Sequence, residues 1–174
     1  MKEYKAAQVR NVALLGHQGA GKTMLVEAML LAAGAINRAG RIEDGNTVSD
    51  FEEEEIQRQM SLSTSVVAVE WQDAKINLLD TPGIFDFAGE VRQALRVADS
   101  ALFVVDAVAG VEVGTELTWG HAGDELPRMV LVSKMDRENA SFERVLTSLN
   151  EHFEAQFLPL LLPIGSQNDF EGVV

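Results

Sequence analysis

The sequence predicts a doubly wound α/β domain with a mostly parallel central sheet and one antiparallel hairpin strand. Three observations support this prediction. Short apolar runs alternate with amphipathic segments along the 174 residues. Two of the runs are apolar throughout, as strands buried on both faces of a parallel sheet are. A phosphate-binding pattern, G-x-x-x-x-G-K-[ST], lies between the first apolar run and the first expected helix.

Strands are expected where short apolar runs are bounded by turn residues. Residues 11–15 form the first run, and residues 101–105 and 129–132 form two later runs that should be buried. Residues 61–71 alternate and are rich in β-branched side chains, and a turn separates them from residues 75–79, so the two segments predict a hairpin. Residues 158–164 are apolar around two prolines and are expected to contain a last short strand.

Helices are expected where apolar residues recur every three or four positions. These segments cover residues 23–33, 87–98, 114–126 and 142–153, and Ser141 is a suitable N-cap for the last one. Residues 35–60 have little apolar periodicity and are expected to form a long loop, of the kind that is usually functional or mobile. The four glutamates at positions 52–55 are expected to lie on a solvated helix face.

The phosphate-binding pattern, called the P-loop below, comprises Gly16, His17, Gln18, Gly19, Ala20, Gly21, Lys22 and Thr23. Its glycines let the backbone direct N–H groups at phosphate oxygens, and the positive end of the next helix adds to the attraction. Lys22 can reach β- and γ-phosphates, and Thr23 can supply a hydroxyl to Mg²⁺. A strand before the pattern and a helix after it are the context that a P-loop NTPase requires.

A second motif, Asp80-Thr81-Pro82-Gly83, follows the strand expected over residues 75–79. Alone it is a turn signature. Beside a P-loop, an aspartate at this strand end can hold Mg²⁺, usually through water, and the N–H of Gly83 can bind a γ-phosphate. Loss of that phosphate would release both loops, which is the behaviour of a switch.

A third motif, Ser133-Lys134-Met135-Asp136, follows the strand expected over residues 129–132 and is called the guanine loop below. A carboxylate here can accept hydrogen bonds from N1–H and the 2-amino group of guanine, a donor pair that adenine lacks. The stem of Lys134 can lie over the base. Because ligands of such domains bind at the carboxyl ends of the strands, the three motifs predict one site for GTP or GDP with Mg²⁺.

The composition of the chain argues against several kinds of site and partner. There are no cysteines, so disulfides and cysteine metal sites are excluded, and a reducing cytoplasm is the expected setting. No apolar run approaches the roughly 20 residues of a membrane helix, and no membrane partner is expected. The formal charge of −13 makes direct nucleic-acid binding by this chain alone unfavourable.

Together the motifs resemble those of P-loop GTPases of the translation-factor type, most closely elongation factor G and its relatives. Residues 80–91, DTPGIFDFAGEV, resemble the DTPGHxDFxxEV stretch of that family, and residues 133–137, SKMDR, resemble its NKMDR. Residues 163–174 resemble the segment leading into a subdomain inserted in its GTPase domain. The resemblance implies a GTPase that acts on the ribosome, largely through domains outside this chain. Residues 1–174 would be the N-terminal part of a GTPase domain, without its last base-contacting loop.

The resemblance also implies that Ser61 is a Mg²⁺ ligand beside Thr23 and Asp80, because Arg58-Gln59-Met60-Ser61-Leu62 stands where the family has RGITI. Ser61 keeps the hydroxyl that binds metal. Gln59, Gly19 and Ser133 replace a glycine, an aspartate and an asparagine of the family. A differently shaped switch loop, an altered monovalent-cation site and weaker guanine binding are the expected consequences, and together they suggest a divergent paralogue.

Ile84 occupies the position of the histidine that orients the attacking water in the family. An alkyl side chain cannot donate or accept a hydrogen bond, so slow intrinsic GTP hydrolysis is expected and the catalytic residue stays unassigned. Three alternatives stay open. The first is a GTP-binding switch with little or no hydrolysis. The second is a ribosomal protection or release-factor-type GTPase. The third is an ATP-using enzyme, against which Asp136 argues.

Overall fold

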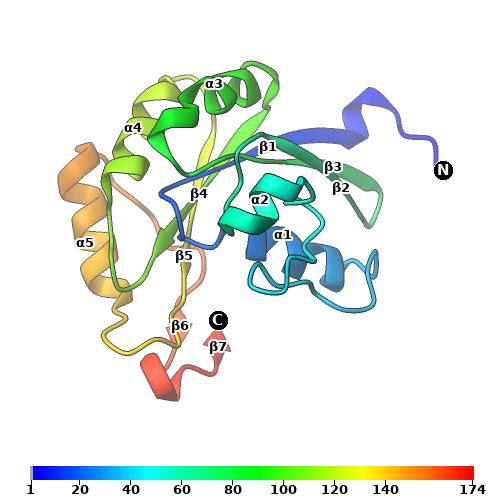
Figure 1. Ribbon diagram of the computed structural model, residues 1–174. Helices are drawn as coiled ribbons and strands as arrows, with labels where there is room; N and C mark the ends of the chain where they lie inside the picture. The colour runs from blue at the N-terminus through cyan, green and yellow to red at the C-terminus, as the bar shows by residue number, and fades with distance from the viewer. Residues whose placement is uncertain (1) are drawn as a thin grey trace.

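A five-stranded sheet with helices on both faces forms the centre of the computed structural model, which describes residues 2–174 (Figure 1). The strands are β1 (Val9–Leu15), β2 (Ser65–Trp71), β3 (Ala74–Asp80), β4 (Ser100–Asp106) and β5 (Arg128–Ser133). Their spatial order is β2-β3-β1-β4-β5. All neighbours are parallel except β2 and β3, which form an antiparallel hairpin. The predicted doubly wound sheet with one antiparallel strand is confirmed.

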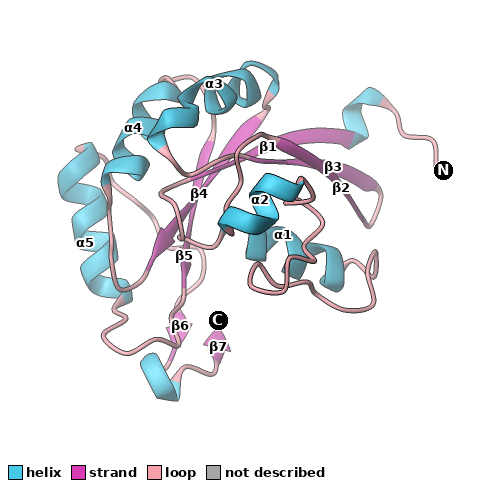
Figure 2. Cartoon of the chain, in the orientation of Figure 1, coloured by secondary structure: helices cyan, strands magenta, loops and turns pink. Residues whose placement is uncertain are grey.

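One face of the sheet packs against α1 and the other against α3, α4 and α5 (Figure 2). The helices are α1 (Lys22–Ala32), α2 (Glu53–Arg58), α3 (Ala88–Val97), α4 (Val113–His121) and α5 (Phe142–Phe153). Short 3₁₀ turns cover Ala6–Gln8, Phe85–Phe87 and Gln167–Asp169, and a separate two-stranded ribbon joins β6 (Pro163–Ile164) to β7 (Gly172–Val173). The hydroxyl of Ser141 accepts a hydrogen bond from the N–H of Arg144, as expected for the N-cap of α5.

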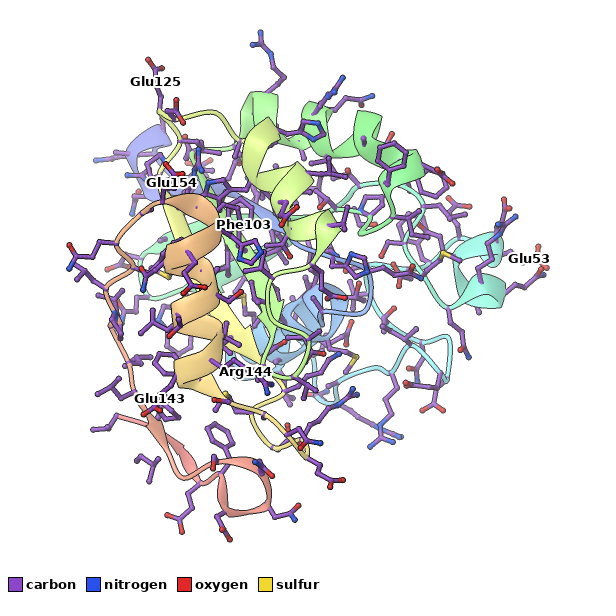
Figure 3. All side chains as sticks on the ribbon, turned by 90° about the vertical axis from the view of Figure 1, so that its left-hand side faces the viewer. Glu53, Phe103, Glu125, Glu143, Arg144 and Glu154 are labelled. Atoms are coloured by element: carbon purple, nitrogen blue, oxygen red, sulfur yellow. The ribbon has the colours of Figure 1, made fainter. Side chains whose placement is uncertain are left out.

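The core follows the alternation of side chains along the strands. Leu14 and Leu102 face α1, where they meet Val26 and Leu30. On the other face Phe103 packs against Trp119 with ring centroids 4.7 Å apart, and Trp119 stacks on Phe153 at 4.3 Å. Figure 3 shows Phe103 among the side chains between α4 and α5. Because both faces of β1, β3 and β4 are packed, their carboxyl ends are held rigidly at one edge of the sheet.

The polar segment before β2 differs from the sequence prediction. The hairpin strand begins at Ser65, not at residue 61, because Ser65 pairs with Asp80, the last residue of β3, and carboxylates take the N–H groups of the residues before it. Glu55 accepts from the N–H groups of Leu62 and Ser63, and Glu90 accepts from that of Thr64. The expected loop also contains α2. Glu53 projects outward from this helix (Figure 3), but Glu55 is only 1% exposed, so the prediction of four solvated glutamates is wrong for Glu55.

Two further expectations are corrected near the other edge of the sheet. Strand β5 is half-buried and Met129 is 55% exposed, because an apolar groove of about 480 Å³, lined by α1 and by all five strands, extends to this edge of the sheet. The strand expected within residues 158–164 is reduced to β6, which pairs only with β7.

Helix α4 ends at His121 and not at residue 126, because Gly123 adopts a left-handed conformation (φ 64°) that stops it. No helix among residues 2–174 has the length and apolar character needed to cross a bilayer.

Candidate functional site

The P-loop joins the carboxyl end of β1 to the first turn of α1. Gly16 has φ 135°, and a Cβ at this position would collide with the carbonyl oxygen of Val104, which passes directly beneath on β4. Gly21 is the N-cap of α1 with φ 105°. These two glycines therefore allow the turn that presents backbone N–H groups and the positive end of an 11-residue helix to an anion.

Lys22 lies beneath this turn with 6% of its surface exposed. Its ammonium donates to the carbonyl oxygens of Gly16 and His17, both at 3.1 Å. Burial lowers the pKa of Lys22 to about 8, and attraction to Asp80 and Asp50 offsets part of that effect. One of the three ammonium protons has no partner in these bonds, so Lys22 can add a hydrogen bond to a phosphate oxygen.

The second motif, residues 80–83, lies against the P-loop and Lys22. A Cβ at Gly83 would lie 2.6 Å from Cα of Gln18 and from Nζ of Lys22, so the backbone of Gly83 rests directly on the P-loop. Thr81 and Pro82 are buried behind it, and the hydroxyl of Thr81 donates to the carbonyl oxygen of Leu14. Thr81 therefore holds the motif against β1, while Gly83 lies against the P-loop.

Four oxygen-bearing side chains converge beside Lys22. The hydroxyl of Thr23 donates to Oδ2 of Asp80 at 2.9 Å and lies 3.4 Å from the hydroxyl of Ser61. Ser61 donates to Oδ1 of Asp50 at 2.7 Å. The structure thus brings together the three predicted metal ligands, although Asp80 and Ser61 are 57 and 38 residues away from Thr23 in the sequence.

The electrostatics of this cluster favour a cation. Asp80 is fully buried, and burial raises its pKa to about 6 against the opposing influence of Lys22 and Thr23. Burial likewise raises the pKa of Asp50. Within residues 2–174, Oδ1 of Asp80 and Oδ2 of Asp50 are buried without a hydrogen-bond partner. Hard carboxylate and hydroxyl oxygens of this kind fit Mg²⁺, which commonly binds one or two carboxylates and completes its shell with water and phosphate.

Asp50 was missed by sequence reasoning. It lies in the polar segment between α1 and α2, where no motif or periodicity marks it. Buried Glu27 of α1 holds this segment in place, because it accepts from the N–H groups of Gly40 (2.7 Å) and Val48 (2.6 Å). Buried Glu55 does the same for the residues that follow α2, since it accepts from the N–H of Leu62 at 2.9 Å. Glu55 lies in a run of glutamates that the sequence predicts to be solvated, so nothing in the neighbouring residues indicates that it binds backbone N–H groups.

The guanine loop follows β5 and contacts the P-loop directly. The hydroxyl of Ser133 donates to the carbonyl oxygen of Ala20 at 2.7 Å, and Nζ of Lys134 donates to that of Gly19 at 2.5 Å. Met135 is buried against Ala107 and Ala140, which anchors the loop, and Asp136 is exposed to solvent. The side chain of Ser133 is shorter than the asparagine of the resembling family, yet it makes a contact with the phosphate-binding turn.

The remaining predicted residues border the site. Gln18 and Gly19 are exposed at the tip of the P-loop. His17 is half-buried, with Nδ1 accepting from the N–H of Gly114 and Nε2 lying 3.5 Å from Glu112.

Ile84 follows Gly83 and lines a small cavity with Phe85 and Leu117, so its methyl groups are partly enclosed by apolar carbon. Leu117 is 36% exposed on α4. In the part of the chain from residue 2 to residue 174, no cluster of three or more histidines and acidic residues offers a second metal site.

Comparison with known proteins agrees with this geometry. The family described as "Elongation factor Tu GTP binding domain" matches residues 7–169. An elongation factor G of Granulibacter bethesdensis is 40% identical over 168 residues, which are 96% of this chain and 24% of that protein. An elongation factor G-like protein of Mycobacterium tuberculosis is 44% identical over 158 residues, 90% of this chain and 22% of that protein.

A solved structure of a protein from Thermus thermophilus superposes with a TM-score of 0.90 at 40% identity, over 97% of this chain and 26% of that one. The chain therefore spans about a quarter of the length of these relatives.

Replacing Asp80 by asparagine should stabilise the metal-free protein at pH 7–8. With its pKa raised from 3.8 to about 6, ionised Asp80 costs up to about 3 kcal/mol above pH 6, and this cost disappears as the pH falls towards 4. We expect Asp80→Asn to gain about 1–3 kcal/mol in urea unfolding with EDTA at pH 7.5, and little at pH 4.5.

Asp73→Asn, at an exposed turn, is the matched control and should change neither value. Lower stability of Asp80→Asn at pH 7.5 would mean that attraction to Lys22 outweighs the cost of burying the carboxylate.

Replacing Glu55 by alanine should release residues 59–63, because Leu62 and Ser63 lose the acceptor of their N–H groups. Hydrogen–deuterium exchange of these amides is expected to accelerate at least tenfold. Glu54→Ala in the same helix removes only an exposed ion pair with Arg58 and should leave the exchange unchanged. Equal exchange in the two variants would show that Glu55 does not order this segment.

Proposed function

The chain belongs to the family of elongation factor Tu GTP-binding domains, and from this premise we propose that it binds GTP or GDP with Mg²⁺ and switches on loss of the γ-phosphate. The observation that carries the proposal is the convergence of Thr23, Ser61 and Asp80 beside the buried ammonium of Lys22. The buried ammonium of Lys22 favours a polyanion as ligand, and the oxygen-bearing side chains beside it favour a divalent cation.

In this proposal the P-loop backbone and Lys22 bind the phosphates, and Thr23, Ser61 and Asp80 hold Mg²⁺, with Asp50 contributing through Ser61 or bound water. When bound, the metal neutralises charge shared by the β- and γ-phosphates. Lys22 keeps its proton at pH 7 because its pKa is about 8. The orphaned oxygen of Asp80 supports the metal assignment, since leaving a buried charged oxygen unpaired is costly.

Selection of guanine is assigned to Asp136, whose exposed carboxylate can accept from N1–H and the 2-amino group of the base. Lys134 is drawn towards the P-loop by its contact with Gly19, which supports a role for its stem as the floor of the base site. Adenine nucleotides lack the donor pair that Asp136 needs. We therefore propose guanine selectivity and do not favour an ATP-using enzyme.

The switch is proposed to involve the segment before β2 and the segment after β3. Gly83 contacts the P-loop, and Ser61 joins Asp50 to the Thr23 hydroxyl. Thr64 and Glu90 link the two segments, since Oε2 of Glu90 accepts from the N–H of Thr64 at 2.8 Å. Loss of a γ-phosphate bound between Ser61 and Gly83 would therefore affect the conformation of both segments together.

We further propose that residues 1–174 are the N-terminal part of a GTPase domain in a longer factor that acts on ribosomes in the cytoplasm, largely through domains outside this chain. The length of the relatives supports this proposal, because the chain corresponds to about a quarter of each. A ribosomal protection or release-factor-type GTPase is less favoured, because the relatives reported above are elongation factor G and an elongation factor G-like protein.

A second candidate is a guanine-nucleotide switch with little hydrolysis, and Ile84 is the observation that favours it. Its alkyl side chain offers no hydrogen bond to a water molecule and is partly enclosed by Phe85 and Leu117. Slow turnover from phosphate positioning and Mg²⁺ alone is compatible with this site. The two candidates share nucleotide binding and differ only in the rate of hydrolysis.

Titration of the complete protein with GDP, GTP and ATP tests nucleotide binding. We expect guanine nucleotides to bind at least a hundredfold more tightly than ATP, because ATP would leave Asp136 without its donors. Asp136→Asn should reduce this preference, whereas Glu138→Gln, an exposed neighbour, should not. ATP binding as tight as GTP binding would refute the guanine assignment.

Replacing Ile84 by histidine should raise GTP hydrolysis at least tenfold if water orientation limits the reaction. The measurement is single-turnover hydrolysis by the complete protein with and without ribosomes. Phe85→His is the matched control, because it introduces an imidazole at the adjacent, 69% exposed position. An unchanged rate for Ile84→His on ribosomes would contradict this account of slow hydrolysis.

A further inference from the structure

Asp106 lies at the carboxyl end of β4 and belongs to none of the three motifs. We propose that Asp106 is a positioning residue of the nucleotide site: its carboxylate holds Lys134 against the carbonyl oxygen of Gly19 and thereby sets the spacing between the guanine loop and the P-loop. The inference rests on the proposed function, since this spacing matters for binding only if one ligand spans both loops.

The carboxylate of Asp106 is fixed before it meets Lys134. Its Oδ1 accepts from the N–H groups of Val108 (2.7 Å) and Ala109 (3.3 Å), and the residue is 8% exposed. In the sheet register Asp106 lies opposite Ser133, so the residue that follows β5 is brought alongside it. The backbone contact continues beyond the strands, because the N–H of Ala107 donates to the carbonyl oxygen of Ser133. Oδ2 is thus held at a defined place beside the guanine loop.

Lys134 bridges two segments that are far apart in sequence. Its Nζ lies 2.6 Å from Oδ2 of Asp106 and 2.5 Å from the carbonyl oxygen of Gly19, which is 115 residues away. Lys134 also adopts a left-handed backbone conformation (φ 57°), uncommon for a residue with a Cβ, so its direction is imposed by the surrounding loop. The ammonium therefore joins the end of β4 to the tip of the P-loop.

The carboxylate decides where this ammonium rests. A lysine has a flexible four-carbon stem and a strongly hydrated charge, so one neutral carbonyl oxygen would have to compete with water for it. An ionised acceptor makes a shorter and stronger hydrogen bond. Burial raises the pKa of Asp106, but hydrogen bonds from Lys134, Val108 and Ala109 outweigh this effect and lower it below the usual range. Asp106 is therefore ionised at neutral pH.

One other side-chain contact ties the guanine loop to the P-loop, the 2.7 Å bond from the hydroxyl of Ser133 to the carbonyl oxygen of Ala20. It is a bond between neutral groups and is shared with the carbonyl oxygen of Val105 at 3.3 Å. The charged bridge through Lys134 is the stronger of the two. Loss of Asp106 should loosen the spacing of the loops without removing either loop.

The test compares a ligand that spans both loops with one that contacts only the P-loop. Affinities of Mg²⁺–GDP and Mg²⁺–pyrophosphate are measured for the complete wild-type protein and for Asp106→Asn, in which Oδ1 can still accept from Val108. We expect GDP affinity to fall about tenfold and pyrophosphate affinity to change less than about twofold. Asp99→Asn is the matched control, because Asp99 precedes the opposite end of β4 and accepts the N–H of Asn11.

A double-mutant cycle with Lys134→Met separates positioning from a general effect on the fold. If Asp106 acts through Lys134, Asp106→Asn should have little further effect on GDP affinity once Lys134 is replaced. Should Asp106→Asn fail to fold, Asp106→Glu shifts the carboxylate by one methylene, and we expect GDP affinity between those of wild type and Lys134→Met.

Equal GDP affinity of wild type and Asp106→Asn would overturn this inference alone, and so would additive effects of the two substitutions or parallel losses for GDP and pyrophosphate. If the wild-type protein binds pyrophosphate but not GDP, the proposed guanine site fails and this inference fails with it. The two failures are therefore distinguishable by the behaviour of the wild-type protein.

Discussion

The burial of two opposite charges, Lys22 and Asp80, at the carboxyl edge of the sheet is the constraint on which the rest of the site depends. Withdrawal from water lowers the pKa of the first and raises that of the second, so each charge is held at a cost. Hydrogen bonds offset part of this cost: Lys22 donates to carbonyl oxygens, and one oxygen of Asp80 accepts from the hydroxyl of Thr23. Bound phosphate and a divalent cation would offset the remaining cost of burying these two charges, which links the stability of this region to its ligands.

Carboxylates organise the segments around that centre. Glu27 and Glu55 are each 1% exposed and accept backbone N–H groups of the polar segment between α1 and β2, and Asp106 does the same for the turn after β4. The acidic residues of this chain therefore do more than cover its surface with solvated charge. Some of these carboxylates supply acceptors that the loops, lacking regular secondary structure, do not obtain from a sheet or helix.

The function proposed above assigns nucleotide binding and GTP hydrolysis to different parts of the structure. The P-loop, Asp80 and the guanine loop meet at one edge, and Ser133 contacts Ala20 despite being shorter than asparagine. Ile84 follows Gly83 and lines a small cavity with Phe85, Leu117 and His121, outside this polar network. In the function proposed above, an alkyl side chain in place of a water-orienting group would thus alter hydrolysis and leave the proposed contacts to phosphate, metal and base in place.

The sequence by itself determined the fold class, the three motifs and the candidate metal ligands Thr23 and Asp80, because strand and helix periodicities and motif spacings are local properties of the chain. Ser61 was added to these ligands only by the family resemblance of residues 58–62. It did not reveal Asp50, Glu55 or Asp106, nor the late start of β2 at Ser65. Their roles arise from contacts such as Lys134 to Asp106, 28 residues apart, and Glu90 to Thr64, 26 apart. Only the tertiary structure decides such pairs, because a carboxylate in a polar segment acquires its partner when packing of the sheet brings a distant backbone donor or ammonium to it.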